Sequence, residues 1–263
     1  MLHDPIRDFV IGPVIFHNWC LRLAFNLVDV AFVHDPVKHF PSSSKVNLNY
    51  CVVPHGIYEY PSGDVNREVI LGEWNLDPQA KYLLCFGHIR DDKNLDLVLN
   101  ALRDFPQYHL IVAGREQSSS QKPIAYYKAI ANELGIADRC HWFHEYIPDS
   151  EVWKYFRISD VLLLTYSQRF NSASGVLNTA THFQIPVIGS SGSILLKLII
   201  EKFGIGIWIS PDSVEEIRRG LREIKTRKLE WGWESYRQEF SWQKNARIVM
   251  DTLISQDFDQ SLV

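Results

Sequence analysis

Between residues 50 and 225, short apolar runs alternate with longer segments whose apolar residues recur at helical spacing. The runs at 82–86, 109–113 and 160–165 have the length of buried strands, and a glycine or a polar loop follows each. The segment at 94–102 places its leucine and valine residues on one face, as an amphipathic helix does. Strands and helices that alternate in this way form a parallel sheet with helices on both faces. The chain is therefore expected to have an α/β fold.

The remaining elements follow from the same kind of pattern. The acidic and hydroxyl residues at 149–151 are expected to cap the helix that they precede. Gly135 is expected to end the helix before it, because glycine favours the position just after a helix. Further strands are expected at 29–33, 50–54, 139–143, 186–189 and 206–209, and further helices at 14–28, 124–134, 149–156, 176–183, 195–202, 214–225 and 242–254.

Composition narrows the class of protein. Hydrophobic residues make up 46% of the 263 residues, which is enough for a substantial core, and the net charge of −4 argues against nucleic acid as a partner. The four cysteines form no CxxC motif, and Cys51 and Cys85 lie in apolar runs, which favours packing in a reducing compartment. No apolar run is long enough to span a membrane, and charged residues interrupt the N-terminus. The sequence predicts a cytoplasmic protein, either free or peripheral at the inner membrane face.

The stretch from Ser172 to Ala180 has the sequence of an anion-binding loop. It reads Ser-Ala-Ser-Gly-Val-Leu-Asn-Thr-Ala and follows the apolar run at 160–165. A small polar loop that opens a helix presents free N–H groups and the positive end of the helix dipole. A phosphate is the usual ligand of such a loop. The alternative is an ordinary connection between strand and helix with a serine cap.

A second loop, Gly87-His88-Ile89-Arg90-Asp91-Asp92-Lys93, follows the run at 82–86 and carries two cations. Arg90 and Lys93 could neutralise a diphosphate, arginine as a fork and lysine as a point charge. The alternative is a solvated loop in which these cations pair with Asp91 or Asp92. Because both loops are expected at the carboxyl ends of parallel strands, they could hold one diphosphate between them.

These landmarks, taken in order, resemble the C-terminal, donor-binding half of a GT-B glycosyltransferase of family 4, also called group 1. The resemblance covers about residues 50–250 and implies a Rossmann-like parallel sheet. Val53-Pro54-His55-Gly56 resembles the hinge between the two domains of that family. The other matching segments are 86–96, 110–114, 146–149, 159–161, 174–177 with 186–188, and 240–242.

The resemblance implies transfer of a sugar from a nucleotide-diphosphate sugar to an acceptor hydroxyl, usually with retention and without a metal or other cofactor. The acceptor could be a glycan, a lipid or a small molecule. The implied catalytic residues are His3, Arg90 and Lys93; the implied diphosphate-binding residues are Gly87, Arg90, Lys93, Ser174, Gly175 and Val176; the implied nucleoside-binding residues are Tyr146, Ile147 and Thr179; and the implied sugar-binding residues are Asn171 and Ser172.

The sequence departs from the family pattern at several places. His88 stands where the family often has arginine, although Arg90 follows two residues later. The family's pair of glutamates around the donor loop is replaced by Asn171 and Thr179. Leu2-His3-Asp4 resembles the end of an acceptor-domain strand whose histidine reaches the donor sugar, and the alternative is a polar turn.

Three segments are expected: a remnant of the acceptor-side domain with a linker at 1–49, a nucleotide-sugar-binding domain at 50–241, and a closing helix and tail at 242–263. The resemblance implies that most of an N-terminal domain is missing, through a truncated start or because a partner chain supplies it. The alternatives to a glycosyltransferase are a nucleotide-sugar-binding subunit that needs such a partner, and a nucleotide-sugar epimerase. An epimerase would need carboxylates near the sugar, and the sequence shows no convincing pair.

Overall fold

The computed structural model describes residues 13–34, 49–61, 63–226 and 232–260. The chain divides into two compact units. We call Ile57–Arg237 the sheet unit, and Met1–Gly56 together with Gln238–Val263 the terminal unit. The two units are described separately below.

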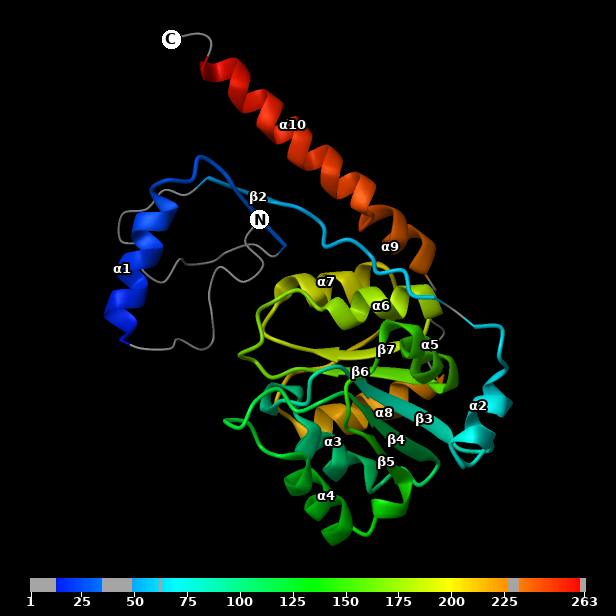
Figure 1. The fold of residues 1–263 in the computed structure, drawn as a ribbon. Helices are drawn as coiled ribbons and strands as arrows, with labels where there is room; N and C mark the ends of the chain where they lie inside the picture. The colour runs from blue at the N-terminus through cyan, green and yellow to red at the C-terminus, as the bar shows by residue number, and fades with distance from the viewer. Residues whose placement is uncertain (1–12, 35–48, 62, 227–231, 261–263) are drawn as a thin grey trace. The chain divides into compact units, whose positions relative to one another are not determined.

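The described residues of the sheet unit form a six-stranded sheet whose neighbouring strands are all parallel (Figure 1). The strand order is β5-β4-β3-β6-β7-β8, so the chain starts in the middle, builds towards one edge, and then builds towards the other. This is the order of the doubly wound nucleotide-binding fold, and the predicted fold is confirmed. The strands are β3 (Lys81–Phe86), β4 (Tyr108–Ala113), β5 (Cys140–Phe143), β6 (Val161–Thr165), β7 (Val187–Ser190) and β8 (Gly206–Trp208).

Helices cover both faces of this sheet (Figure 1). Helices α3, α4 and α8 lie on one face, where α3 contacts both α4 and α8. Helices α5, α6 and α7 lie on the other face, and α2 packs on α5. The bounds are α2 (Arg67–Glu73), α3 (Leu95–Leu102), α4 (Ile124–Glu133), α5 (Asp149–Ile158), α6 (Gly175–Phe183), α7 (Ile194–Lys202), α8 (Val214–Thr226) and α9 (Trp233–Glu239), with short 3-10 helices η1 (Asp91–Lys93) and η2 (Ala137–Arg139).

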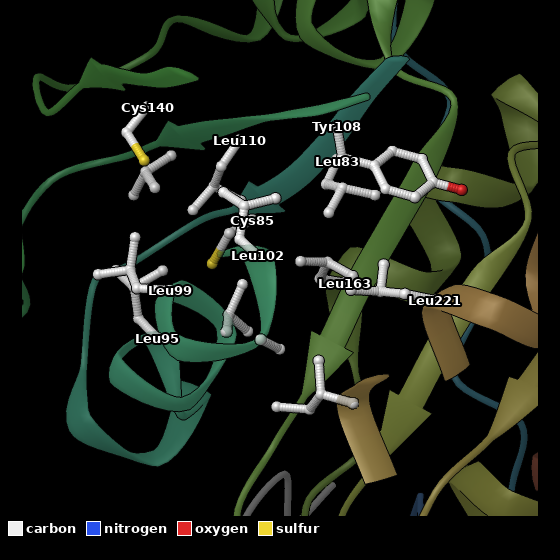
Figure 2. Packing of buried hydrophobic residues seen from close by; sticks show 14 of the residues in the cluster. Leu83, Cys85, Leu95, Leu99, Leu102, Tyr108, Leu110, Cys140, Leu163 and Leu221 are labelled. Atoms are coloured by element: carbon white, nitrogen blue, oxygen red, sulfur yellow. The ribbon is translucent and has the colours of Figure 1, made fainter. Parts of the chain in front are cut away.

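The core of the first face shows why these segments form this fold (Figure 2). Leu83 of β3 and Leu110 of β4 are fully buried against Leu99 and Leu102 of α3. Continuous apolar strands such as β6, whose five residues are all buried, are typical of parallel sheets covered on both faces. Cys85 belongs to the same cluster, and burial raises the pKa of its thiol, in line with the predicted packing role.

The terminal unit contains a separate pair of parallel strands. Residues 50–54 were expected to continue the main sheet, but β2 (Tyr50–Val52) pairs with β1 (Ala31–Val33) instead. Asn245 of α10 (Trp242–Gln260) donates from Nδ2 to the carbonyl oxygen of Pro54 at 2.7 Å. The C-terminal helix therefore belongs with β2, although almost 200 residues separate them in sequence. The unit also contains α1 (Val14–Phe25).

Other expectations differ in detail. The helices α2 and α9 have seven residues each and were not predicted, because so few turns give a weak periodic signal. Residues 149–151 do not cap α5 from outside but form its first turn; Pro148 is the N-cap residue and makes no side-chain capping bond. The helix α10 extends to Gln260, beyond the predicted end at 254. Within the described ranges, no helix is long and apolar enough to cross a membrane.

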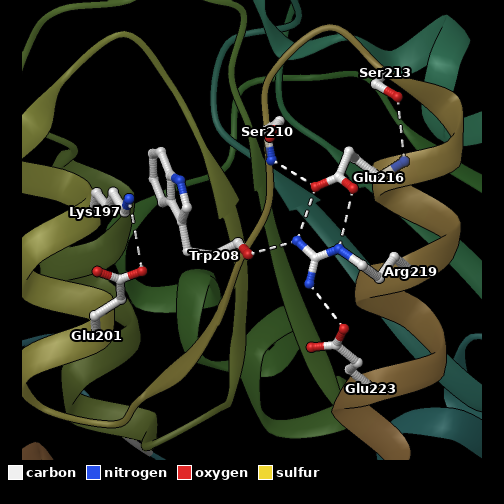
Figure 3. Close-up of polar contacts among 8 residues, drawn as sticks. All are labelled: Lys197, Glu201, Trp208, Ser210, Ser213, Glu216, Arg219 and Glu223. Carbon is white, nitrogen blue, oxygen red and sulfur yellow. Dashed lines mark hydrogen bonds and ion pairs between the residues drawn. The ribbon is translucent and has the colours of Figure 1, made fainter.

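A polar network fixes the start of α8 beneath the end of β8 (Figure 3). Arg219 donates from Nη2 to the carbonyl oxygen of Trp208 at 3.0 Å and to Oε2 of Glu216 at 2.8 Å. The backbone N–H of Ser210 donates to the same oxygen of Glu216 at 2.9 Å. These hydrogen bonds, first from Arg219 and then from Ser210, lower the pKa of Glu216 to about 2.

We predict that Glu216→Gln lowers the free energy of unfolding by about 1–2 kcal/mol at neutral pH, because it removes a charged hydrogen-bond acceptor. The folded pKa of Glu216 lies below its usual value of 4.5, so this stability is present above that value and is lost as the pH falls towards 2. Urea unfolding at pH 7 and at pH 3 should therefore give a smaller difference between wild type and variant at pH 3. A difference that grows on acidification would contradict the assignment.

Candidate functional site

The site lies between β3 and β6, at the point where the strand order reverses. Strands β3 and β6 pair only through Leu83 with Val161 and Leu84 with Leu162, so the ladder stops before the carboxyl end of β3. The loop after β3 and the loop after β6 leave from these two ends. In open parallel sheets, ligands bind in the crevice at such a switch point.

Two glycines shape the first loop. Gly87 has φ +84° and its N–H donates to the carbonyl oxygen of Ala113 at 2.8 Å. A Cβ atom on Gly114, which has φ +134°, would stand only 2.4 Å from the carbonyl oxygen of Gly87. The ends of β3 and β4 can approach this closely because Gly114 has no side chain, and Gly87 allows the positive φ angle of the turn.

Lys93 is a buried cation at the end of η1. Its residue is only 6% exposed, and its ammonium donates to the carbonyl oxygen of Phe86, the last residue of β3. Among the described residues, no carboxylate lies within ion-pair distance of it. Burial lowers the pKa of Lys93 below its usual value of 10.5. An anion placed beside this ammonium would therefore be strongly favoured.

Arg90 reaches from the first loop to the second. Its guanidinium lies over the ring of Phe170, 5.1 Å from the ring centroid, and 6.0 Å from that of Tyr166. Its Nε also forms an ion pair of 2.8 Å with Oδ1 of Asp92, as the alternative interpretation of this loop expected. Arg90 is thus held in place by its neighbours and remains partly exposed.

The second loop ends in the N-terminus of α6. The side chain of Ser174 caps the helix by accepting from the N–H of Leu177 at 3.3 Å, and its Oγ lies 3.0 Å from the hydroxyl of Tyr166. A Cβ atom on Gly87 would stand 3.5 Å from Cγ2 of Val176 and 3.6 Å from Nζ of Lys93. The structure therefore brings the helix start, the glycine and the buried cation together.

Asp212, which could not be identified as a site residue from the sequence, holds the two loops in place relative to each other. Asp212 accepts from Nδ2 of Asn94 at 2.9 Å with one oxygen and from the N–H of Gln168 at 3.0 Å with the other. The N–H of Ser167 donates to the carbonyl oxygen of Asp92 at 2.7 Å. Asp212 has a left-handed backbone conformation, which marks a turn, but nothing in the sequence links it to loops more than 40 residues away.

Further basic residues surround the first loop. The pKa of His88 is lowered by burial first and then by Arg115, Lys93 and Arg90. The N–H of Ile89 donates to the carbonyl oxygen of Arg115 at 2.9 Å, which sets the two segments side by side. Arg115 therefore adds a third cation beside a loop whose own cations, Arg90 and Lys93, are accompanied by the carboxylates of Asp91 and Asp92.

A hollow of about 340 Å³ adjoins this region at the carboxyl end of β5. It contains both predicted nucleoside-binding residues of the loop after β5, Tyr146 and Ile147. Tyr146 is 69% exposed, and the guanidinium of Arg115 lies 5.9 Å from its ring centroid. The aromatic side chains that line the hollow are Trp74, Trp142, Phe143, Tyr146 and Tyr155.

The other predicted residues are placed as follows. Thr179 is 3% exposed and its Oγ1 donates to the carbonyl oxygen of Gly175 at 3.2 Å, since a threonine inside a helix bonds the carbonyl four residues back. Its hydroxyl thus donates within α6, and the expected nucleoside contact stays a prediction. Asn171 is exposed and donates to the carbonyl oxygen of Arg169 at 2.9 Å, and Ser172 is half-buried. His3 lies outside the described residues.

The family described as "Glycosyl transferases group 1" matches residues 66–247. The chain belongs to this family. The match spans the sheet unit and the first residues of α10, and it includes both loops at the switch point. No curated protein matches the chain significantly in sequence.

Solved structures show the same fold at low sequence identity. Sucrose-phosphate synthase from Thermosynechococcus elongatus is 17% identical, with a TM-score of 0.70 over 94% of this chain and 62% of that one. WaaG, a glycosyltransferase involved in lipopolysaccharide biosynthesis, is 23% identical, with a TM-score of 0.59 over 76% of this chain and 54% of that one. Alr3699/HepE from Anabaena, in complex with UDP, is 15% identical, with a TM-score of 0.74 over 94% of this chain and 70% of that one. The chain thus spans less than two thirds of the first two relatives.

We predict that Gly114→Ala destabilises the protein by about 2 kcal/mol or more, since the new Cβ meets backbone and the backbone angle becomes strained. Gly72→Ala in α2 is the matched control, because a Cβ there meets nothing within 4 Å. That control should raise the free energy of unfolding by about 0.5–1 kcal/mol. Urea unfolding of the two variants checks both signs, and equal effects would refute the close approach of β3 and β4.

Proposed function

We propose that this chain binds a nucleotide-diphosphate sugar at the switch point and transfers the sugar to an acceptor hydroxyl, with retention and without a metal. The observation that carries the proposal is the buried ammonium of Lys93 beside the N-terminus of α6. Membership of the group 1 family makes a donor diphosphate the ligand that best fits this pair.

The proposed chemistry depends on charge rather than on covalent participation of the protein. Negative charge develops on the leaving diphosphate as the bond to the sugar breaks. Lys93, Arg90 and the N–H groups at the start of α6 are fixed before the reaction, so their stabilisation of that charge needs no rearrangement. Two cations and a helix terminus are suited to offset the charge of a diphosphate.

The comparisons support a nucleotide as the ligand class. Structures of the Anabaena relative contain UDP and UDP-glucose, and they share the fold of this chain. The aromatic hollow beside Arg115 is suited to the base of such a donor, with the diphosphate at the switch point. The acceptor class, whether a glycan, a lipid or a small molecule, stays a prediction without a site of its own.

A second candidate function is a donor-binding chain that works only with a further polypeptide. The helix α1 favours it, because one face exposes Ile15, Trp19 and Leu23. The pair β1–β2 favours it as well, since parallel strands are normally buried within larger sheets. An α/β polypeptide that extends this sheet would cover both surfaces. No observation favours the epimerase.

We predict that Arg90→Ala and Lys93→Met each weaken the binding of nucleoside diphosphates by roughly 1–3 kcal/mol, the range for a lost charged partner. Arg103→Ala is the control, because Arg103 is exposed and its loss removes the same charge from the sheet unit. Calorimetric titration with UDP, GDP and ADP measures the effect, and thermal unfolding confirms that each variant folds. Unchanged affinity in both site variants would refute the diphosphate assignment.

The lowered pKa of Lys93 gives a separate prediction. A bound diphosphate favours the charged lysine and raises its pKa, so affinity should fall as the pH rises through the lowered pKa of the free protein. The diphosphate keeps a constant charge over this alkaline range, because its last ionisation lies near pH 6. Titrations from pH 7 upwards should show this decline in wild type, and Lys93→Met should remove it. A decline of the same size in the variant would assign the effect to another group.

A further inference from the structure

We propose that the aromatic hollow after β5 selects guanine, with the carboxylate of Glu145 as the group that determines the choice of base. This inference rests on the proposed function, and it narrows the donor to a guanosine-diphosphate sugar. Neither the family match nor the relatives assign a base to this chain.

The hollow lies at the right distance from the switch point. Adjacent strands are about 4.8 Å apart, so the end of β5 lies roughly 10 Å from the end of β3 along the sheet edge. The N–H of Gly114 donates to the carbonyl oxygen of Phe143 at 2.8 Å, which joins the glycine beside the first loop to the last residue of β5. A nucleotide whose diphosphate lies beside Lys93 can therefore extend along the strand ends with its base at Tyr146.

The walls of the hollow suit a flat aromatic ligand. Tyr146 is mostly exposed, so its ring is accessible. Bases stack on such rings and on arginine guanidinium groups without regard to sequence, and Arg115 already lies over this ring. Stacking holds a base in the hollow but does not distinguish one base from another. The choice therefore depends on the polar groups of the lining.

Glu145 is the carboxylate of the lining that is available for this choice. It is exposed, and it makes no hydrogen bond or ion pair with any residue in the described part of the chain. Glu151, the other carboxylate of the lining, is paired with Lys154 at 2.6 Å. Both carboxylates act on the Tyr155 hydroxyl, whose pKa is raised to about 12 by burial first and then by Glu151 and Glu145. Glu145 therefore lies close enough to the hollow to meet a base there.

The chemistry of the base edges decides which ligand fits. An ionised carboxylate only accepts hydrogen bonds, and it can accept two in parallel. Guanine presents two adjacent donors, N1–H and the 2-amino group, and so pairs with both oxygens. Uracil presents one N–H between two carbonyl oxygens, which a carboxylate repels, and adenine presents an acceptor beside its amino group. A free carboxylate thus favours guanine and disfavours uracil at the same time.

Calorimetric titration of the whole chain with GDP, IDP, UDP and ADP tests the inference. IDP differs from GDP only in lacking the 2-amino group, so it isolates one of the two proposed hydrogen bonds. We expect GDP to bind about tenfold more tightly than IDP and at least tenfold more tightly than UDP, a factor that corresponds to about 1.4 kcal/mol. Tighter binding of UDP than of GDP would overturn the inference.

Glu145→Gln supplies the second arm, with Glu133→Gln at the exposed end of α4 as its control. We expect Glu145→Gln to lower the affinity for GDP about tenfold and to raise that for UDP, because the amide offers one acceptor oxygen and one donor, which match the N–H and a carbonyl oxygen of uracil. An equal loss for all four nucleotides would overturn the specificity role. If UDP alone binds, the assignment of guanine fails and the proposed function stands. If none of the four binds, the proposed function fails with it.

Discussion

The site depends on the short ladder of hydrogen bonds between β3 and β6. Two residue pairs join these central strands, and the ladder ends before Cys85 and Phe86. Beyond that point, the end of β6 and the loop after it bond to η1, where the N–H of Ser167 donates to the carbonyl oxygen of Asp92. The hydroxyl of Thr165 donates to the carbonyl oxygen of Lys93 at 2.9 Å, and the ammonium of Lys93 bonds the carbonyl oxygen of Phe86. The chain thereby places a buried cation, rather than further ladder hydrogen bonds with β6, at the end of β3.

A buried cation of this kind costs stability, because its charge is removed from water and, in the described part of the chain, no carboxylate forms an ion pair with it. The fold tolerates the cost because the surroundings of Lys93 are rigid. Gly87 and Gly114 fix the strand ends, and Asp212 joins the two loops through Asn94 and Gln168. The same rigidity means that the positive groups are already in position when an anion arrives. Burial of Lys93 thus lowers the stability of the fold, and it also holds a positive charge in place before an anion binds.

Much of this arrangement could be predicted from the sequence. The strands of the sheet unit could be placed within one or two residues because their apolar runs are continuous and end at glycines or polar loops. The short helices α2 and α9 could not, because seven residues give too few turns for a periodic signal. The partner of β2 could not be predicted either, because the pairing of parallel strands depends on connections that the local pattern does not contain. Thr179 matched a position in a motif, yet its hydroxyl bonds within its own helix.

The sequence by itself determined the alternation of strands and helices, the two loops with their cations and glycines, and the family resemblance, since these are local patterns along the chain. Only the tertiary structure decided that Lys93 is buried, that Arg90 lies over Phe170, and that Asp212 joins both loops. It also decided that Tyr146 and Glu145 share a hollow with Trp74, which is about 70 residues earlier in the chain. These properties depend on which elements meet across the sheet edge, and the packing of the whole unit sets that.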